Sequence, residues 1–166
     1  MNENALIIIA KYPEKDSVKT RLKGLISDKQ RLQLYVSLLE TTVQKLKAIP
    51  GTDTFIAYAP ASAEDYFSRF GTRLIPLEEG GLGERMYYAF SMVFGHGYKR
   101  ASLVGADIPG LSASIILKSF EVLSANDIVY GPARDGGYYL VGMSRLIREI
   151  FEDVPWSSDQ TLKRSL

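Results

Sequence analysis

The chain has 166 residues and a formal net charge of +1, with 46% hydrophobic and 23% charged residues, as in a single soluble domain spanning residues 1–166. So small a net charge gives no overall field for nucleic acid or an anionic membrane, and we expect neither as a partner. The sequence has no cysteine, which excludes disulfides and thiolate metal sites, and it shows no targeting or membrane-spanning segment; a cytoplasmic location is expected.

The first part of the chain alternates apolar runs with amphipathic segments. Residues 5–10 form a continuous apolar run, which predicts a central parallel strand buried on both faces. After a basic loop, a capping box at residues 27–30 predicts a helix over residues 28–48, with Tyr35 and Leu39 on its apolar face. The elements predicted next are a strand at 54–59, a short helix that begins at Ser62 and ends at Phe70, and an edge strand at 73–75.

The second part continues this alternation and then breaks it. The predicted elements are a helix at 84–94, a strand at 102–105, a helix over 112–123 capped by Ser112, strands at 127–130 and 138–141, and helices at 146–151 and 159–166. Alternating strands and helices indicate an α/β protein with a mainly parallel sheet. Because the last two strands are close in sequence, we expect one antiparallel strand and therefore a mixed sheet.

One acidic residue follows a buried strand directly. Asp107 comes after the apolar run at residues 101–105 and is flanked by small residues and turn formers. Ligands of open α/β sheets bind outside the carboxyl ends of the strands, so a carboxylate here is placed to hold a divalent cation and the phosphates it bridges. The alternative is an aspartate that only caps a turn.

A second acidic residue follows another predicted strand. Asp135 lies in the segment 131–137 and is followed by two glycines. A hairpin turn explains this pattern, because Asp-Gly is a strong hairpin signal. Two aspartates at strand ends would also converge on one crevice, where Asp107 and Asp135 could hold Mg²⁺ or Mn²⁺. A hairpin turn and a metal ligand are compatible.

The loop after the first strand is basic. It contains Lys11, Lys19 and Arg21, and these side chains suit phosphates, since lysine supplies a point charge and arginine a planar fork. The alternative is a solvated basic surface. The sequence has neither a Walker A motif nor a G-x-G-x-x-G motif.

A glycine-rich loop opens the helix predicted at residues 84–94. In the segment 79–85, the residues Gly81, Gly83 and Glu84 lie where free backbone N–H groups could meet an anion or the edge of a base. A flexible loop with a helix cap explains the same residues. These three residues are our candidates for nucleotide contact beyond the basic loop.

Taken together, four segments resemble a bacterial family of glycosyltransferase-like proteins of GT-A fold. The segments are Lys11-x-Pro13 with Lys19-Thr-Arg21-Leu22, Gly81-Leu-Gly83-Glu-Arg-Met86, Gly105-Ala-Asp107-Ile-Pro-Gly-Leu111 and Gly131-Pro-Ala-x-Asp135-Gly-Gly-Tyr-Tyr-Leu140. Some members are named as radical-SAM- or selenodomain-associated transferases or as arsenosugar-biosynthesis glycosyltransferases. The family is distantly similar to 2-phospholactate guanylyltransferase and molybdopterin-cofactor guanylyltransferase, and the resemblance covers nearly the whole chain.

This resemblance implies a three-layer α/β/α nucleotide-diphospho-sugar transferase fold with a divalent metal, Mg²⁺ or Mn²⁺. It matches Asp107 and Asp135 to the acidic positions, both metal-binding and catalytic. It matches Lys11, Lys19 and Arg21 to the basic loop, and residues 81–84 to the loop near the nucleotide. The family usually has glycine where this chain has Asp16. Relatives tend to continue past position 166 with another acidic segment, so either the chain is short or this sequence is a fragment that lacks a C-terminal segment.

The function implied is metal-dependent transfer from an activated nucleotide donor. Glycosyl transfer from a nucleotide-sugar to a small-molecule acceptor is the leading expectation. The alternatives are nucleotidyl transfer from a nucleoside triphosphate to a phosphorylated small molecule, a non-catalytic nucleotide-binding module, and a scaffold without a ligand. The edge strand at residues 73–75 would also allow copies of the chain to associate as a homo-oligomer.

Overall fold

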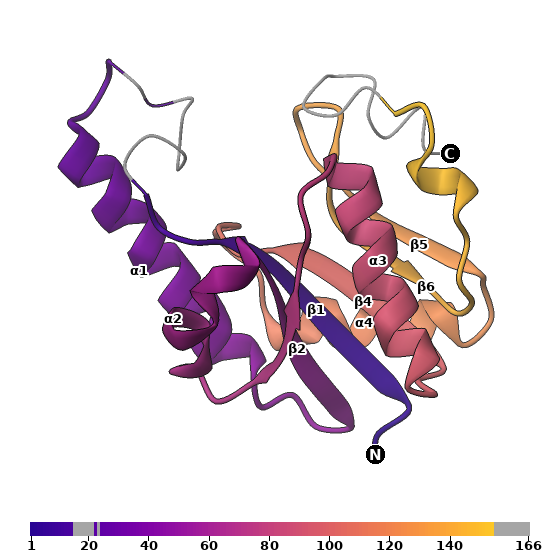
Figure 1. Cartoon of the computed structure of the whole chain (residues 1–166). Coiled ribbons are helices and arrows are strands. Elements are labelled where there is room, and N and C mark those ends of the chain that lie inside the picture. The colour runs from indigo at the N-terminus through magenta and orange to yellow at the C-terminus, as the bar shows by residue number, and fades with distance from the viewer. Residues whose placement is uncertain (15–21, 23, 155–166) are drawn as a thin grey trace.

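A six-stranded mixed sheet forms the centre of the molecule (Figure 1). The computed structural model describes residues 1–14, 22 and 24–154. The strands are β1 (Asn4–Lys11), β2 (Thr52–Ala59), β3 (Arg73–Pro76), β4 (Arg100–Gly105), β5 (Ile128–Pro132) and β6 (Tyr138–Met143). Their order is β3-β2-β1-β4-β6-β5. Strands β1 to β4 pair in parallel, and β6 pairs antiparallel with both β4 and β5, which confirms the prediction of one antiparallel strand.

Helices connect the first five strands, and a hairpin loop joins β5 to β6. The helices are α1 (Asp28–Leu46), α2 (Glu64–Ser68), α3 (Leu82–Gly95) and α4 (Ala113–Leu123), with short 3₁₀ helices η2 (Ala61–Ala63) and η3 (Glu149–Phe151). The predicted capping box is present, because the Ser27 hydroxyl accepts from the Gln30 N–H and the Gln30 side chain accepts from the Ser27 N–H. Ser112 caps α4 as expected. None of the helices in the described part of the chain is long and apolar enough to cross a membrane.

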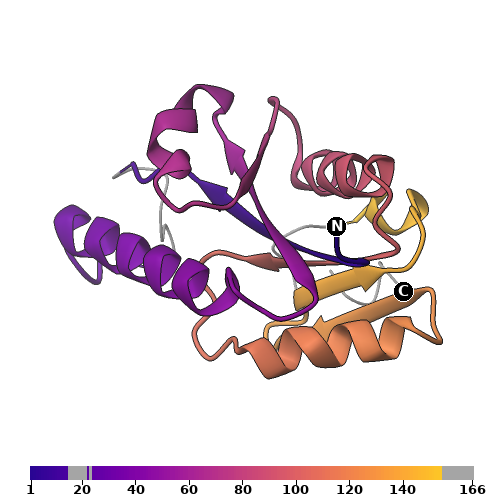
Figure 2. The ribbon, with the colours of Figure 1, turned by 90° about the horizontal axis from the view of Figure 1, so that it is seen from below.

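The sheet is covered on both faces, which gives the three-layer α/β/α architecture expected from the sequence. Helices α1, α2 and α4 pack on one face, where their apolar side chains meet Leu6 and Ile8 of β1. Helix α3 and the segment around η3 pack on the other face, where they meet Ile7. Figure 2 shows α3 and α4 on opposite sides of the sheet. Alternate residues of β1 thus face different cores, which is why the whole strand is apolar.

Two helix predictions were wrong. Residues 62–70 do not form one helix capped by Ser62, because that residue lies inside η2 and α2 starts later without a side-chain cap. The Ala63 N–H bonds to the Pro60 carbonyl at 3.0 Å, three residues back, and so tightens this turn. Residues 146–151 contain only η3, because burial of Ile150 and Phe151 against the α3 core outweighs the weak preference of six residues for a helix. The helix predicted at 159–166 lies outside the described residues.

The strand order sets the position of the functional site. Strands β1 and β4 are neighbours, and the chain moves from β1 to one side of the sheet through β2 and β3, whereas β6 and β5 lie on the other side of β4. The loops after β1 and β4 therefore leave the sheet at a topological switch point. In open α/β sheets this crevice at the carboxyl ends of the strands is where ligands bind.

Gly142 of β6 lies where neighbouring atoms leave no room for a side chain. A Cβ atom on Gly142 would lie 2.6 Å from the Ser102 Oγ and 2.8 Å from a Val129 methyl carbon, and the Ser102 hydroxyl is itself buried and bonded to that of Ser119. Gly142→Ala should therefore lower the free energy of unfolding by about 2 kcal/mol, as expected for overpacking. Urea denaturation measures the change. The matched control is Gly95→Ala, where the added Cβ meets no atom within 4 Å apart from its chain neighbours and the backbone of its own helix; an equal loss in both variants would contradict the packing argument.

Candidate functional site

A pocket of about 710 Å³ opens at the carboxyl ends of β1 and β4. Its charged lining comes from three separate elements. Lys11 is the last residue of β1, Asp107 lies two residues beyond β4, and Arg85 lies in the first turn of α3. Apolar side chains, among them Leu77 and Leu82, form much of the remaining wall. The structure thus brings together Lys11 and Asp107, as the sequence predicted.

The loop that carries Asp107 is anchored at both of its ends. Ala106 and Leu111 are buried, so their side chains fasten the loop to the core on either side of the turn. The Leu111 carbonyl also accepts a hydrogen bond of 3.2 Å from the Lys45 ammonium of α1. Gly110 has a φ of +82°, a conformation that glycine adopts without strain, and it lets the chain turn into α4. The partly exposed Asp107 side chain is therefore carried by a fixed loop.

Tyr35 forms part of the same pocket wall. Its ring is only 3% exposed, and its hydroxyl bonds to the backbone of Lys11. Burial raises the pKa of the Tyr35 hydroxyl well above its usual value, the hydrogen bond to Lys11 opposes this shift, and the charge of Asp107 adds to it. The hydroxyl is therefore protonated at neutral pH, and its proton is donated to the Lys11 carbonyl.

Arg85 was not among the residues selected from the sequence. Its Nε donates to the Glu78 carbonyl at 3.1 Å, which fixes the guanidinium beside the pocket. In the part of the chain that the structure describes, Arg85 forms no salt bridge. A signal was present in the sequence, because a cation in the first turn of a helix is disfavoured by the helix dipole and so calls for another explanation. An anion in the pocket would supply one.

The glycine-rich loop is placed differently from the pocket of Lys11 and Asp107. Gly81 is the N-cap of α3, Gly83 is buried, and the Glu84 carboxylate folds back over Gly80. Gly83 and Glu84 line a separate pocket of about 540 Å³ beside η3. The three residues therefore lie at the start of α3, and none of them lines the pocket of Asp107. Their contact with a nucleotide remains a prediction.

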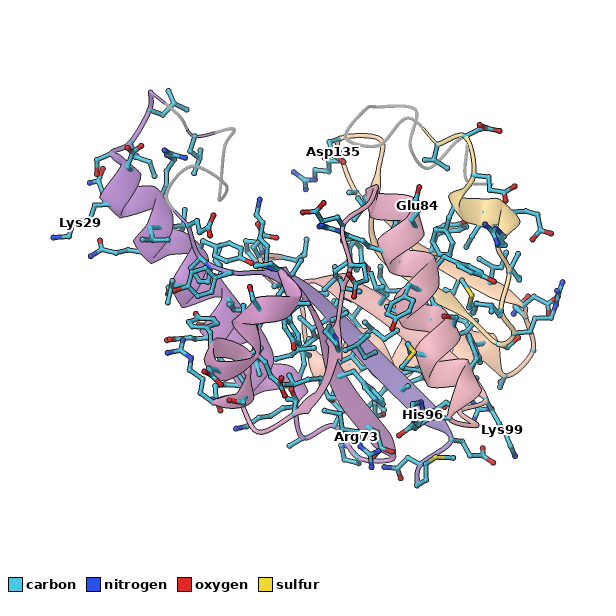
Figure 3. All side chains as sticks on the ribbon, viewed as in Figure 1. Lys29, Arg73, Glu84, His96, Lys99 and Asp135 are labelled. Carbon is cyan, nitrogen blue, oxygen red and sulfur yellow. The ribbon has the colours of Figure 1, made fainter. Side chains whose placement is uncertain are left out.

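Asp135 lies at the tip of the loop between β5 and β6. Its Oδ1 accepts a hydrogen bond of 3.1 Å from the Gly137 N–H, and the Ala133 N–H bonds to the Gly137 carbonyl at 2.9 Å, so the hairpin interpretation is confirmed. Asp135 does not line the pocket of Asp107. Figure 3 places Asp135 at the same end of the molecule as Glu84 and far from Arg73 and Lys99. Its roles in metal binding and catalysis remain predictions.

Two of the predicted basic residues, Lys19 and Arg21, lie outside the described residues. The sequence-based proposal for them therefore rests on the motif alone. Lys11 is the member of the predicted basic set that the structure places in the pocket, and Arg85 adds a second cation to it.

The donor atoms of the pocket would suit a hard divalent cation that also binds the oxygen atoms of a phosphate ligand. Among residues 1–14, 22 and 24–154, no three histidine, aspartate or glutamate side chains come together as a metal-binding group. Asp107 offers the pocket a carboxylate. Mg²⁺ is usually held by one or two carboxylates together with waters and substrate phosphates, so this donor set fits a metal that binds together with a phosphate ligand.

Comparison with known proteins gives a family and a fold. A family model described as "Uncharacterized protein conserved in bacteria (DUF2064)" matches residues 42–158. The crystal structure of a provisionally named nucleotide-diphospho-sugar transferase from Desulfovibrio desulfuricans is 30% identical in sequence, with a TM-score of 0.89 over 99% of this chain and 75% of that chain.

Two more distant structures have the same fold. A cytidylyltransferase from Leptospira borgpetersenii is 9% identical, with a TM-score of 0.62 over 99% of this chain and 68% of that one. The Mycobacterium tuberculosis protein Rv0371c, solved as a complex with manganese, is 14% identical, with a TM-score of 0.60 over 98% of this chain and 80% of that one. At these identities the similarity shows the fold alone.

The two cations of the pocket predict anion binding that can be tested without knowing the substrate. Pyrophosphate should bind the wild-type protein in the presence of Mg²⁺, and Arg85→Gln should weaken this binding about tenfold, because a charge-assisted hydrogen bond is lost. Titration calorimetry at low salt measures the dissociation constant. Arg73→Gln, at the opposite end of the molecule (Figure 3), is the matched control and should bind as the wild type does. Equal affinity in the wild type and Arg85→Gln would contradict the assignment.

Proposed function

Because the chain belongs to the DUF2064 family of bacterial proteins and has the nucleotide-diphospho-sugar transferase fold, we propose that it is a transferase that uses a nucleotide-sugar as its donor. The observation that carries the proposal is the meeting of Lys11, Arg85 and Asp107 in one pocket at the switch point of the sheet. A nucleoside diphosphate group is the ligand whose charges match this pocket best.

The cations explain how the pocket would assist transfer. When the bond between the sugar and the diphosphate breaks, negative charge grows on the diphosphate oxygen. Lys11 and Arg85 would lie beside that charge and would stabilise it electrostatically. Lys19 and Arg21, from the same basic loop of the sequence, are proposed to add to this stabilisation.

A metal ion is proposed to take part. The residue that would hold it is Asp107, with Asp135 as the second acidic residue contributed from the β5–β6 loop. When bound, Mg²⁺ or Mn²⁺ would supply a further positive charge on the donor phosphates. Gly81, Gly83 and Glu84 are proposed to contact the nucleotide from the start of α3.

The reaction proposed is a direct displacement. A hydroxyl oxygen of the acceptor forms a bond to the anomeric carbon of the sugar, the bond from that carbon to the diphosphate oxygen breaks, and the nucleoside diphosphate leaves with the electron pair. The acceptor proton passes to a carboxylate, for which Asp107 and Asp135 are the candidates. The name given to the D. desulfuricans relative favours sugar transfer over transfer of a nucleotidyl group.

A thermal-shift panel tests the proposal. Nucleotide-sugars, nucleoside diphosphates and nucleoside triphosphates are each added with and without Mg²⁺ or Mn²⁺. A ligand present at about 100 times its dissociation constant stabilises the folded state by about 2.7 kcal/mol, which is readily detected as a rise in melting temperature. We expect a metal-dependent rise with a nucleotide-sugar, and we expect Asp107→Asn to abolish it.

The control is Asp127→Asn. Asp127 is an exposed aspartate that lies directly before β5, away from the pocket, and forms an ion pair with Arg145. Its replacement should leave the ligand-induced rise in melting temperature intact. A response to triphosphates instead of nucleotide-sugars would replace glycosyl transfer with nucleotidyl transfer. No response to any nucleotide would refute the proposed function.

A further inference from the structure

The hydroxyl of Tyr35 bonds to both polar groups of one backbone residue. It accepts a hydrogen bond of 3.0 Å from the Lys11 N–H and donates one of 2.8 Å to the Lys11 carbonyl. Tyr35 comes from α1, 24 residues further along the chain. A tyrosine on the apolar face of a helix would be expected to contribute packing, and these two bonds add a polar contact with the end of β1.

The strand pattern explains why Lys11 needs this contact. On one side, the end of β1 is joined to β2, because the Tyr12 N–H bonds to the Ala59 carbonyl at 2.8 Å. On the other side, pairing with β4 ends at Ile9 and Gly105. Neighbouring residues of a strand direct their N–H and C=O groups to opposite sides, so Lys11 faces the side from which β4 has already departed. The Tyr35 hydroxyl takes the place of the missing strand and satisfies both groups.

This contact lies inside the candidate site. Lys11, Tyr35 and Asp107 all line the same pocket, and the hydroxyl occupies the gap that opens where β1 and β4 separate. Tyr35 is buried in the core that α1, α2 and α4 form against the sheet, so its position is fixed by packing. A rigid group thus holds the backbone from which the Lys11 side chain enters the pocket.

We propose that Tyr35 is a positioning residue of the donor site, whose hydroxyl fixes the Lys11 backbone and thereby places the Lys11 ammonium against the phosphates of the donor. This inference rests on the proposed function. Tyr35 makes its contribution through Lys11, and the hydroxyl alone is responsible, since the ring serves only for packing.

The test uses Tyr35→Phe, which keeps the ring and removes the hydroxyl. The probe is pyrophosphate with Mg²⁺, whose dissociation constant is measured by titration calorimetry. We expect Tyr35→Phe to bind it about tenfold more weakly than the wild type, because the ammonium is no longer held in register with the phosphates. Once a substrate is known, kcat should fall more than KM rises, since the ammonium acts chiefly on the charge that develops during transfer.

The matched control is Tyr98→Phe. The Tyr98 hydroxyl also donates a hydrogen bond, of 2.6 Å, to the Asp53 carboxylate. This contact lies at the amino-terminal ends of the strands, opposite the end where the pocket opens. Both variants should lose some stability, and only Tyr35→Phe should lose affinity. A Tyr35→Phe variant that binds pyrophosphate as tightly as the wild type would overturn the inference and leave the proposed function standing. A wild-type protein that binds neither pyrophosphate nor any nucleotide would overturn both.

A double-mutant cycle tests whether Tyr35 acts through Lys11. In a Lys11→Ala background, Tyr35→Phe should cause no further loss of affinity, because the ammonium that it positions is absent. A further tenfold loss would overturn the inference. If Tyr35→Phe does not fold, amide hydrogen exchange on the wild type is decisive: pyrophosphate should slow exchange of the Lys11 N–H, and an unchanged rate would overturn the inference.

Discussion

Two neighbouring parallel strands separate at the centre of this sheet, and the site depends on that separation. Strand β4 ends at Gly105 while β1 continues to Lys11, so backbone groups that would bond across the sheet must be satisfied elsewhere. The Tyr35 hydroxyl does this for Lys11, and the anchored loop around Asp107 turns away into α4. The gap between the two strand ends is the pocket, and part of its wall is made by the buried residues Tyr35, Leu77 and Ala106.

The charges of the pocket are local and do not follow from the composition of the chain. The net charge is +1, so no long-range field draws a substrate in. Instead, Lys11 and Arg85 come from β1 and α3 to meet one carboxylate, Asp107. This arrangement suits a ligand that is strongly anionic and that brings oxygen atoms of its own to a metal. A nucleotide-sugar with its diphosphate has both properties, and so it is the donor we propose.

The sequence predicted the fold well because the patterns of apolar residues that indicate strands and helices follow from which positions are buried. Every position of β1 from Ala5 to Ile8 faces one core or the other, so the strand is apolar throughout. Arg85 and Tyr35 were harder to identify. The sequence correctly placed Tyr35 on the apolar face of a helix. The hydrogen bonds of its hydroxyl to Lys11 depend on where the pairing of β1 with β4 ends, and the sequence around Tyr35 does not reveal that. Asp135 shows the reverse case, since its Asp-Gly signal predicted the turn correctly without deciding whether it also binds a metal.

We propose that the pocket forms a complete metal site only together with a phosphate ligand. Electron paramagnetic resonance of Mn²⁺ tests this most directly, by comparing the wild type with Asp107→Asn, each with and without a nucleoside diphosphate. We expect little Mn²⁺ to bind the protein alone, and we expect a protein-bound Mn²⁺–nucleotide complex to form in the wild type and to be lost in Asp107→Asn. Tight binding of Mn²⁺ without nucleotide, or the same complex in Asp107→Asn, would contradict it.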